Sequence, residues 1–555
     1  MDANFINQAN IKRNEYLLKT EDLFTCNRKT WSDSFAVHFE EICANIWQEQ
    51  DKMTLSAISY LEYTMLYTNF INRRYFGEVR IYGDESYLDI NQRIIGEYDI
   101  SFIFIYFDKL WEDLFDLKRR YVGKISAQDV TTYMLQALPD FYSYFVNTAR
   151  LALRELCDKT PFIDVIKSDA FMINVGDYMA KTETIYTERK NKDAVKYSDW
   201  FSKRLQGEYV FGDFSNLDFS RGSFFETDFR YAQFRNSTLC NTSFAGSCLT
   251  GSDYRNAKMD ECCLDYCAIY EADFSNASLK KASLVSARAD EGLTNKAEWQ
   301  FVGYLPVSFR NADLSGADFT DAYLSGADFT GAILTNTVFT NTVLDNAVFS
   351  TRIAQLSDEQ SRRIKVKESS GLISKDDKKT PGVLRTPITV ETKMATNRKK
   401  SIKRYSSFFV LEQLDNAPSI SSPRTTEVQK MPNTKGMEGF DYFARRNLVS
   451  EKLKNLFALY MPGYNFELAA YMGQEKKDVT PLWLFDPPAN SDFHANYRTD
   501  GYVSHITPLD KKMPFIFTAR SPKGIRSIVV QLAVAESMLR RSIFGVKLTR
   551  LLEFE

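Results

Sequence analysis

The chain has few of the residues and motifs from which active sites are usually built. Its 555 residues include only three histidines, His38, His494 and His505, and eight cysteines without a CxxC pair. Asp492 and Asp500 lie near the last two histidines, but nothing in this spacing fixes the geometry of a metal site. No GxGxxG motif opens a predicted helix, and no phosphate loop or nucleophile elbow occurs. We therefore expect no catalytic residue, no metal site, no cofactor and no enzymatic activity.

A long apolar run and a net charge are also missing. The best apolar run, residues 102–107, is far shorter than the ~20 apolar residues of a membrane-spanning helix. The first residues, Met1-Asp2-Ala3-Asn4, lack the basic and apolar regions of a signal peptide. The 70 Lys and Arg nearly balance the 72 Asp and Glu, so no overall field steers a charged partner. We expect no membrane span, no direct nucleic-acid binding, and a cytoplasmic, bacterial protein.

Between Phe214 and Phe349, large apolar residues recur every five positions. In 24 pentads of one frame, interrupted once, the same slot holds a large apolar residue. At a hydrophobic content of 44%, this series has a chance probability on the order of 10⁻⁹, so the period is a structural feature. The residues in this slot that we expect to form the core include Phe214, Phe219, Phe229, Leu264, Phe274, Phe309, Leu314, Phe319, Leu324, Phe329 and Leu334.

A second slot, two positions before the large residue, is filled mostly by small residues such as Ala312 and Ala327. A period of five fits neither a single helix nor a single strand. It fits a coil in which each pentad forms one side and turns a corner, with both slots pointing inward. The second slot must be small because two inward groups share a narrow interior. Cys262 and Cys267 occupy it and are expected to be packed thiols, with a metal or disulfide site as the alternative.

Segments such as Ala312-Asp313-Leu314-Ser315-Gly316 and Ala327-Asp328-Phe329-Thr330-Gly331 resemble the pentapeptide repeat, A-(D/N)-L-x-x. The resemblance covers about a quarter of the chain. It implies a right-handed, four-sided (quadrilateral) β-helix with four pentads per coil. About six coils would then form a rod roughly 30 Å long, at ~4.8 Å per strand. The resemblance does not specify a function, because such coils serve as rods or platforms in many proteins.

The predicted fold class is a multidomain protein, and its first domain, residues 1–205, is expected to be mainly helical and aromatic-rich. We expect helical structure at 35–75 and 101–120 and a short strand at 78–82. A capping box at Ser126 should open a further helix that runs to about Leu156. Its aromatic side chains are expected in the core, with a docking surface for another subunit as the alternative.

The β-helix domain is expected at residues 206–366. An open coil end would expose unpaired backbone groups, so the preceding helical region should cover the first end. A capping box at Ser357 should open a short helix, through about Val366, that closes the other end. The interruption at 285–308 contains Trp299 and Tyr304. It is either a degenerate or rod-packed loop, or a protruding loop through which these two residues contact a partner.

Residues 367–435 lack periodicity and are predicted to be a basic, proline-containing linker or strap. The segment 351–435 contains 18 Lys or Arg and 9 Asp or Glu, a net charge of +9. Its densest basic run is solvated linker or a strap on an acidic surface of this protein or of a partner. The candidate interaction residues in this run are Arg398, Lys399, Lys400, Lys403 and Arg404.

The last domain, residues 436–555, is expected to be a small α/β or α+β domain. Its apolar pattern predicts a helix at 440–460, strands at 481–485 and 513–518, and a closing helix at 524–541. No constellation of catalytic residue types stands out in this sequence. Its role is therefore not specified by the pattern.

These features favour a non-enzymatic structural or scaffold component of a protein assembly, with the β-helix as rigid spacer and binding platform. Its partners would be other protein subunits, within an oligomer or complex. One alternative is a DNA mimic that binds a type II topoisomerase or another DNA-binding protein, as some pentapeptide proteins with acidic rods do. The net charges of 209–290 and 307–350, −3 and −4, are modest for such mimicry. Another alternative is a secreted effector or toxin with a C-terminal activity domain.

Overall fold

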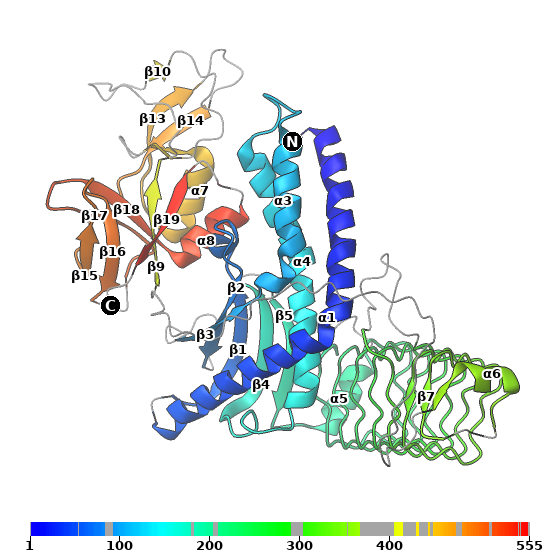
Figure 1. Cartoon of the computed structure of the whole chain (residues 1–555). Helices are drawn as coiled ribbons and strands as arrows, with labels where there is room; N and C mark the ends of the chain where they lie inside the picture. The colour runs from blue at the N-terminus through cyan, green and yellow to red at the C-terminus, as the bar shows by residue number, and fades with distance from the viewer. Residues whose placement is uncertain are drawn as a thin grey trace, which may run out of the picture.

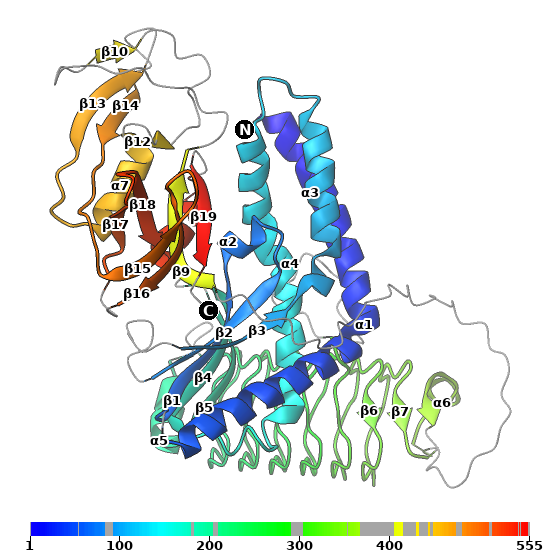
Figure 2. The same cartoon turned by 60° about the vertical axis from the view of Figure 1, so that its left-hand side comes forward.

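The computed structural model describes residues 2–53, 55–83, 93–178, 182–203, 209–289, 304–351, 353, 355–366, 405–413, 429–431, 442–443, 448–472, 480–509, 513–541, 543 and 546–552. They form an N-terminal unit of helices and one sheet, a central β-helix, and a C-terminal unit with two sheets (Figures 1 and 2). In Figure 1 the β-helix and the C-terminal unit extend to opposite sides of the N-terminal unit. None of the helices in these ranges combines the length and the apolar character that crossing a membrane requires.

Three long helices build the upper part of the N-terminal unit: α1 (Ala3–Asp51), α3 (Ile105–Lys118) and α4 (Ala127–Leu156). The predicted capping box opens α4, because the Ser126 hydroxyl accepts from the Asp129 N–H at 3.1 Å and the Asp129 carboxylate accepts from the Ser126 N–H at 2.8 Å. Aromatic side chains of the three helices share one core, among them Phe24, Phe107 and Phe141. The aromatic residues of this unit therefore mainly serve its packing.

The N-terminal unit also contains a five-stranded sheet, of which only the strand at 78–82 was predicted. Its order is β3-β2-β1-β4-β5. The bounds are β1 (Ile58–Met65), β2 (Phe76–Tyr82), β3 (Arg93–Asp99), β4 (Lys167–Asp177) and β5 (Thr182–Arg189). Two short helical segments, α2 (Tyr67–Phe70) and η2 (Ser101–Ile103), connect its elements.

The expected helical structure at 35–75 is wrong beyond Asp51, where α1 ends. The segment Ile58–Met65 is instead the central strand, and residues on both of its faces are buried. Such a strand has apolar residues without strict alternation, so its sequence fits a buried helix equally well. Burial on both faces, which tertiary packing creates, explains the error.

The central β-helix begins at Tyr209, and successive coils pair through parallel bridges twenty residues apart, as Asp213 does with Gln233 and Gln233 with Asp253. Twenty residues are four pentads. The large residues of the predicted slot point inward, and from Phe214 to Phe329 those named above are at most 3% exposed. Leu334, in the last coil, is only partly buried.

The corners of the coils explain the polar slots of the pentad. The residue two positions after the inward large residue has a positive φ at most corners. One corner carries asparagine in five successive coils: Asn216, Asn236, Asn256, Asn276 and Asn311. Asparagine tolerates the left-handed conformation better than most residues. Asparagines of adjacent coils are also hydrogen-bonded: the side-chain N–H of Asn236 donates to the side-chain oxygen of Asn216 at 3.2 Å.

The interruption of the β-helix is shorter than predicted. Ala287 and Ala289 are still inside the coil, and Arg288 still pairs with Tyr323 of the next coil. At the interruption the pairing distance grows from twenty to thirty-five residues, from Asp273 to Ser308. Residues 290–303, which include the predicted contact residue Trp299, lie outside the described residues.

The first end of the β-helix is covered as predicted. The short helix α5 (Ala194–Phe201) lies over this end, and its last residue inserts a ring into the coil (Figure 1). The Phe201 ring lies 4.8–5.5 Å, between centroids, from four inward rings: Phe214, Phe219, Phe224 and Phe229. These four belong to consecutive pentads, so Phe201 contacts the inward ring of each of them.

The second end carries the predicted capping box at Ser357, which opens α6 (Asp358–Arg363). This helix ends at Arg363, three residues before the predicted end, and β8 (Lys365–Val366) follows it. The strands β6 (Asp328–Phe329), β7 (Val348–Phe349) and β8 pair in parallel on one side of the coil. The side-chain amide of Gln360 donates to the carbonyls of Phe339 and Thr342 at 2.8 and 2.9 Å, which attaches α6 to the last coil.

The small inward slot provides a direct test of this packing. Ala327 is fully buried in the coil, whereas Ser325 lies in an outward slot and is partly exposed. We expect Ala327→Leu to lower the free energy of unfolding by about 1–3 kcal/mol, because the narrow interior cannot accept the added volume. The matched control, Ser325→Leu, should change it by less than about 0.5 kcal/mol. Chemical denaturation measures both; equal losses for the two variants would contradict the inward assignment.

The C-terminal unit consists of two sheets and two helices. One sheet has the order β15-β16-β19-β9-β18-β17 and the other β10-β13-β14-β12-β11. The strands of the first are β9 (Tyr405–Glu412), β15 (Phe493–Tyr497), β16 (Val503–Pro508), β17 (Ile516–Arg520), β18 (Arg526–Gln531) and β19 (Lys547–Leu552). Those of the second are β10 (Gln429–Met431), β11 (Tyr442–Phe443), β12 (Leu448–Ser450), β13 (Glu467–Met472) and β14 (Thr480–Leu484).

Three predictions for this part of the chain need correction. Residues 405–412, assigned to the linker, form the interior strand β9. The helix predicted at 440–460 starts only at Glu451, as α7 (Glu451–Tyr460), because Ser450 caps it by accepting from the N–H of Leu453. The helix predicted at 524–541 is the strand β18 followed by α8 (Leu532–Arg540), since Ile528, Val529 and Val530 favour a buried strand.

Candidate functional site

The candidate functional site is the junction where α4 and β5 meet the first coils of the β-helix. At its centre lies Glu271, a corner residue of the β-helix whose side chain is fully buried. Its carboxylate pairs with two arginines one turn apart on α4, Arg150 and Arg154, the second at 3.0 Å. The N–H of Tyr304 donates to the same carboxylate at 2.9 Å. Burial alone would raise the pKa of Glu271, but the two arginines outweigh it and lower that pKa.

The corner positions above Glu271 complete this contact. The guanidinium of Arg150 lies 4.2 Å from the centroid of the Tyr231 ring, one of the stronger arrangements of a cation over an aromatic face. Gly251 stands at the corner between Tyr231 and Glu271 with a φ of 68°. A Cβ at Gly251 would come within 2.3 Å of the Tyr231 ring. Glycine is therefore required here so that Tyr231 can lie flat beneath Arg150.

A ladder of charges on the adjoining side of the β-helix extends the junction. Asp253 pairs with Arg255 at 2.8 Å and with Arg235 at 2.5 Å, and both arginines also pair with Asp158, just after α4. Burial alone would raise the pKa of Asp253, but hydrogen bonds and charges from the two arginines lower it to about 2. The aspartates of these coils thus hold arginines that reach the N-terminal unit.

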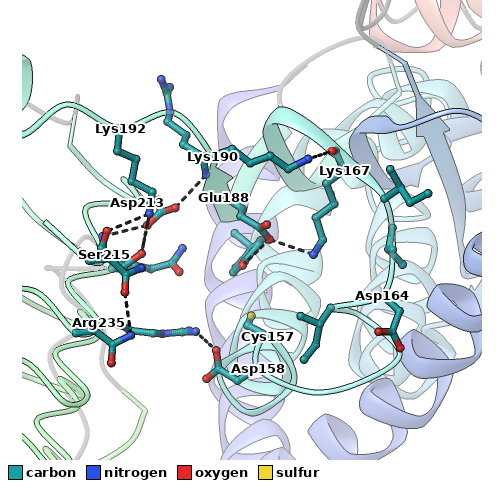
Figure 3. A pocket seen from close by; sticks show the side chains of 18 residues that line it. Cys157, Asp158, Asp164, Lys167, Glu188, Lys190, Lys192, Asp213, Ser215 and Arg235 are labelled. Carbon is teal, nitrogen blue, oxygen red and sulfur yellow. Dashed lines mark hydrogen bonds and ion pairs between the residues drawn. The ribbon is translucent and has the colours of Figure 1, made fainter.

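A cleft of about 610 Å³ opens beside the ladder, between β5 and the first coils (Figure 3). Lys192 pairs with Asp213 at 2.7 Å, and Lys167 pairs with Glu188 at 3.1 Å. Figure 3 shows these side chains converging from both units onto the cleft. Lys190 donates to the backbone carbonyl of Lys167. The cleft is therefore polar, and its lysines and carboxylates are largely occupied by one another.

The chemistry available in the cleft is limited. Burial raises the pKa of the Cys157 thiol to about 12, so very little thiolate is present near neutral pH. Arg235 is shared between Asp253 and Asp158. Within the described ranges, no group of three or more His, Cys, Asp or Glu residues is arranged to hold a metal ion. The arrangement can bind and orient elements of the fold through charge pairs.

A second junction joins the N-terminal and C-terminal units. The carboxylate of Glu536, on α8, is fully buried and accepts from the N–H groups of Tyr67 and Thr68 at 2.9 and 3.0 Å. Burial raises the pKa of Glu536. Arg550 of β19 lies 3.4 Å from Glu78 of β2. Buried polar groups, together with apolar contacts, thus attach the C-terminal unit to the N-terminal unit.

The predicted interaction residues have different outcomes. Tyr304 was a candidate for contact with a partner, but it is 8% exposed and its ring packs on Phe24 of α1 at 4.7 Å. It therefore fastens the end of the interruption to the N-terminal unit, in agreement with a loop packed on its own chain. The basic residues predicted at 398–404 and Trp299 lie outside the described residues.

The sequence analysis missed the residues of the Glu271 junction. One signal was available: Arg150 and Arg154 lie four positions apart in the otherwise apolar second half of α4. Another was Glu271 itself, in a corner slot that holds asparagine or glycine in many coils. Neither signal identifies its partner, because 121 residues separate Arg150 from Glu271.

Comparison with known proteins gives one family match. Residues 218–256 and 322–350 match the family model described as pentapeptide repeats, in 8 copies. The central β-helix is therefore built from pentapeptide repeats, as the sequence suggested. No curated protein matches the chain.

Solved proteins similar to part of this chain include two pentapeptide-repeat proteins and a fluoroquinolone resistance protein. The protein Rfr23 of the cyanobacterium Cyanothece 51142 is 18% identical, over 27% of this chain and 98% of that chain, with a TM-score of 0.16. HetL, from Nostoc sp. strain PCC 7120, is 18% identical over 29% of this chain and 98% of its own, with a TM-score of 0.12. QnrB1, a plasmid-mediated fluoroquinolone resistance protein, is 16% identical over 28% of this chain and 82% of its own, with a TM-score of 0.15. Each of these overlaps covers less than a third of this chain.

Proposed function

We propose that this protein is a non-enzymatic scaffold component of a cytoplasmic protein assembly, in which the β-helix is a rigid binding platform. The observation that carries the proposal is the buried contact of Arg150 and Arg154 with Glu271. Because buried ion pairs attach the β-helix to the N-terminal unit, we expect the two to keep a fixed relative orientation. The proposed location is supported by all eight cysteines, which are free thiols in the structure.

We infer further that the β-helix is the right-handed, four-sided form. The spacing of twenty residues between paired positions supports four pentads per coil. Left-handed corner residues at intervals of five support one turn of the chain per pentad. A four-sided rod offers flat sides on which partner subunits can dock.

Mimicry of DNA is the competing interpretation, and the charge pairs argue against it. A mimic needs a continuous array of acidic side chains that face solvent. Asp213, Asp253 and Asp328 lie in one column on the β-helix, but each pairs with a lysine or arginine. The first two also lie at the junction with the N-terminal unit, where a nucleic-acid-binding protein has no access.

The proposal can be tested by gentle purification of the full chain, carrying an affinity tag, from its native source. We expect a complex of several protein subunits, with a mass well above that of the 64.0 kDa chain. The measurement is light scattering on the purified material, followed by identification of the subunits. Recovery of the chain alone, or of a topoisomerase whose activity the chain inhibits, would contradict a scaffold function.

A further inference from the structure

The last coil of the β-helix has unpaired strand edges on two of its sides. In the coil before it, the N–H of Phe319 donates to Val338 and that of Asp321 donates to Thr340, both at 2.9 Å. The same positions of the last coil are Phe339 and Asn341. Among the residues that the structure describes, their N–H groups have no acceptor, nor do those of Leu334 and Asn336 on the preceding side. Unpaired edge groups of this kind are a template for a further strand.

The outward side chains change character in the same coil. Here the four outward slots hold Ile333, Val338, Val343 and Val348. The slot of Ile333 holds Asp218, Thr238, Lys258, Ser278 and Asp313 in the preceding coils. The slot of Val338 holds Ser223, Ser243, Cys263, Ser283 and Asp318. Ile333 is 52% exposed and Val338 40%. β-Branched apolar residues stabilise strands that are paired and partly covered. Their presence at an edge without a partner therefore indicates that a further strand covers them.

One side of this coil already has such a neighbour. The strand β8 pairs in parallel with β7, Lys365 opposite Val348, and the N–H of Lys365 donates to Ala347 at 2.8 Å. Val348 is the outward residue on that side. The coil end therefore accepts an added strand at one of its four apolar positions, while the sides of Ile333 and Val338 have no strand partner in the part of the chain that the structure describes.

A groove of about 790 Å³ lies along the side of Val338, between residues 337–345 of the last coil and residues 355–363 of the cap, and the side of Ile333 lies beyond it. The cap is held to the coil at several points: Gln360 donates to two carbonyls, Gln355 donates to the Leu334 carbonyl at 3.2 Å, and Arg363 pairs with Asp345 at 3.3 Å. Because α6 and β8 both stand on the coil end, a second β-helix cannot stack flat on it. Figure 2 shows α6 at this end of the rod. An added strand can instead pair with the coil edge, as β8 does on the side of Val348.

We propose that the open sides of Ile333 and Val338 bind an extended segment of a partner protein by strand addition. The segment would be about ten residues long, the length of two pentads. Its backbone carbonyls accept from Leu334, Asn336, Phe339 and Asn341, and its apolar side chains cover Ile333 and Val338. This inference rests on the proposed scaffold function and names the contact site for one of its partners.

The first test uses a defined peptide with the sequence of residues 332–341 of this chain, which supplies two pentads in the correct phase with Ile and Val in the outward slots. We expect a labelled peptide to bind the full chain saturably, with slower hydrogen exchange at Phe339 and Asn341. The double variant Ile333→Lys/Val338→Lys should weaken binding at least tenfold, because edge lysines oppose strand addition. Lysine suits this slot, since Lys258 occupies it in an earlier coil.

The matched control is Thr238→Lys/Ser243→Lys, which changes the same two slots in a coil with both edges paired. It should bind the peptide as the parent does. A peptide that fails to bind the parent, or that binds the Ile333→Lys/Val338→Lys variant equally well, overturns the inference. A parent chain that dimerises in sedimentation experiments, with a monomeric variant, also overturns it, because the occupant is then a second copy.

Purification of the native assembly separates this inference from the proposed function. The expected result is loss of at least one subunit from the assembly of the Ile333→Lys/Val338→Lys variant. If that variant retains the full set of subunits, the strand-addition site is wrong and the scaffold function stands. If the parent itself purifies without subunits, the scaffold function fails, and the peptide titration alone decides whether the edge accepts a strand.

Discussion

Replacing Phe201 by alanine should lower the free energy of unfolding by about 3–5 kcal/mol, among the largest effects of a single substitution in this chain. The ring is 1% exposed and contacts the inward rings of four consecutive pentads. Loss of the ring leaves a cavity at the end of the narrow interior. The cavity cannot collapse, because backbone hydrogen bonds between the coils fix its walls. Chemical denaturation measures the loss, and hydrogen exchange should show the first coil opening before the later coils.

A control on the same helix separates packing from helix formation. Val195 of α5 is 71% exposed, and Val195→Ala should change stability by less than about 0.5 kcal/mol. Phe201→Leu, which keeps most of the volume, should lose less than Phe201→Ala. If Phe201→Ala and Val195→Ala have the same small effect, α5 does not seal the coil.

Replacing Glu271 by alanine should cost a similar amount, about 3–5 kcal/mol, because it leaves the buried guanidinium of Arg150 without its counter-charge. We expect the β-helix to loosen from α4 before it unfolds, which limited proteolysis at the junction would detect. The matched control is Glu261→Ala. Glu261 occupies a corner slot with the same left-handed conformation, but its side chain is half exposed and pairs with Lys281 at 3.5 Å. Its removal should cost at most about 1 kcal/mol.

The contribution of the Glu271 charge should depend on pH in a defined direction. The pKa of Glu271 in the folded protein is lowered from the ordinary value of 4.5. A group with a lowered pKa stabilises the folded state fully above its unfolded pKa and loses that effect as pH falls. The stability difference between the parent and Glu271→Gln should therefore be constant near neutral pH and shrink below about pH 4.5. A difference that grows in acid would contradict the assignment of an ionised Glu271.

The central part of the fold could be predicted because its contacts repeat at a short and constant distance along the chain. Phe274 packs on Tyr254, twenty residues before it, and Phe329 packs on Phe349, twenty residues after it. Every coil therefore imposes the same requirement on each slot, and the sequence displays that requirement many times. The two capping boxes at Ser126 and Ser357 were predictable for a related reason, since each is a contact within four residues.

The flanking units could not be predicted as well, because their periodicity depends on which faces become buried. Ile58–Met65 and Arg526–Gln531 are strands that are buried on both faces along most of their length, so they do not show the alternation of a half-exposed strand. β9 is separated by more than one hundred residues from its partners β18 and β19. Nothing near Tyr405 in the chain indicates that these partners exist.

By itself, the sequence determined the coil, its inward slots, its corners and the signals of its caps, because all of these are local or periodic requirements. The tertiary structure alone decided that Glu271 meets Arg150 and that Glu536 meets Tyr67 and Thr68. It also decided which edges of the last coil lack a partner among the described residues. The physical reason is that a charge or a free N–H is costly only when burial removes it from water, and burial depends on residues far away in the chain.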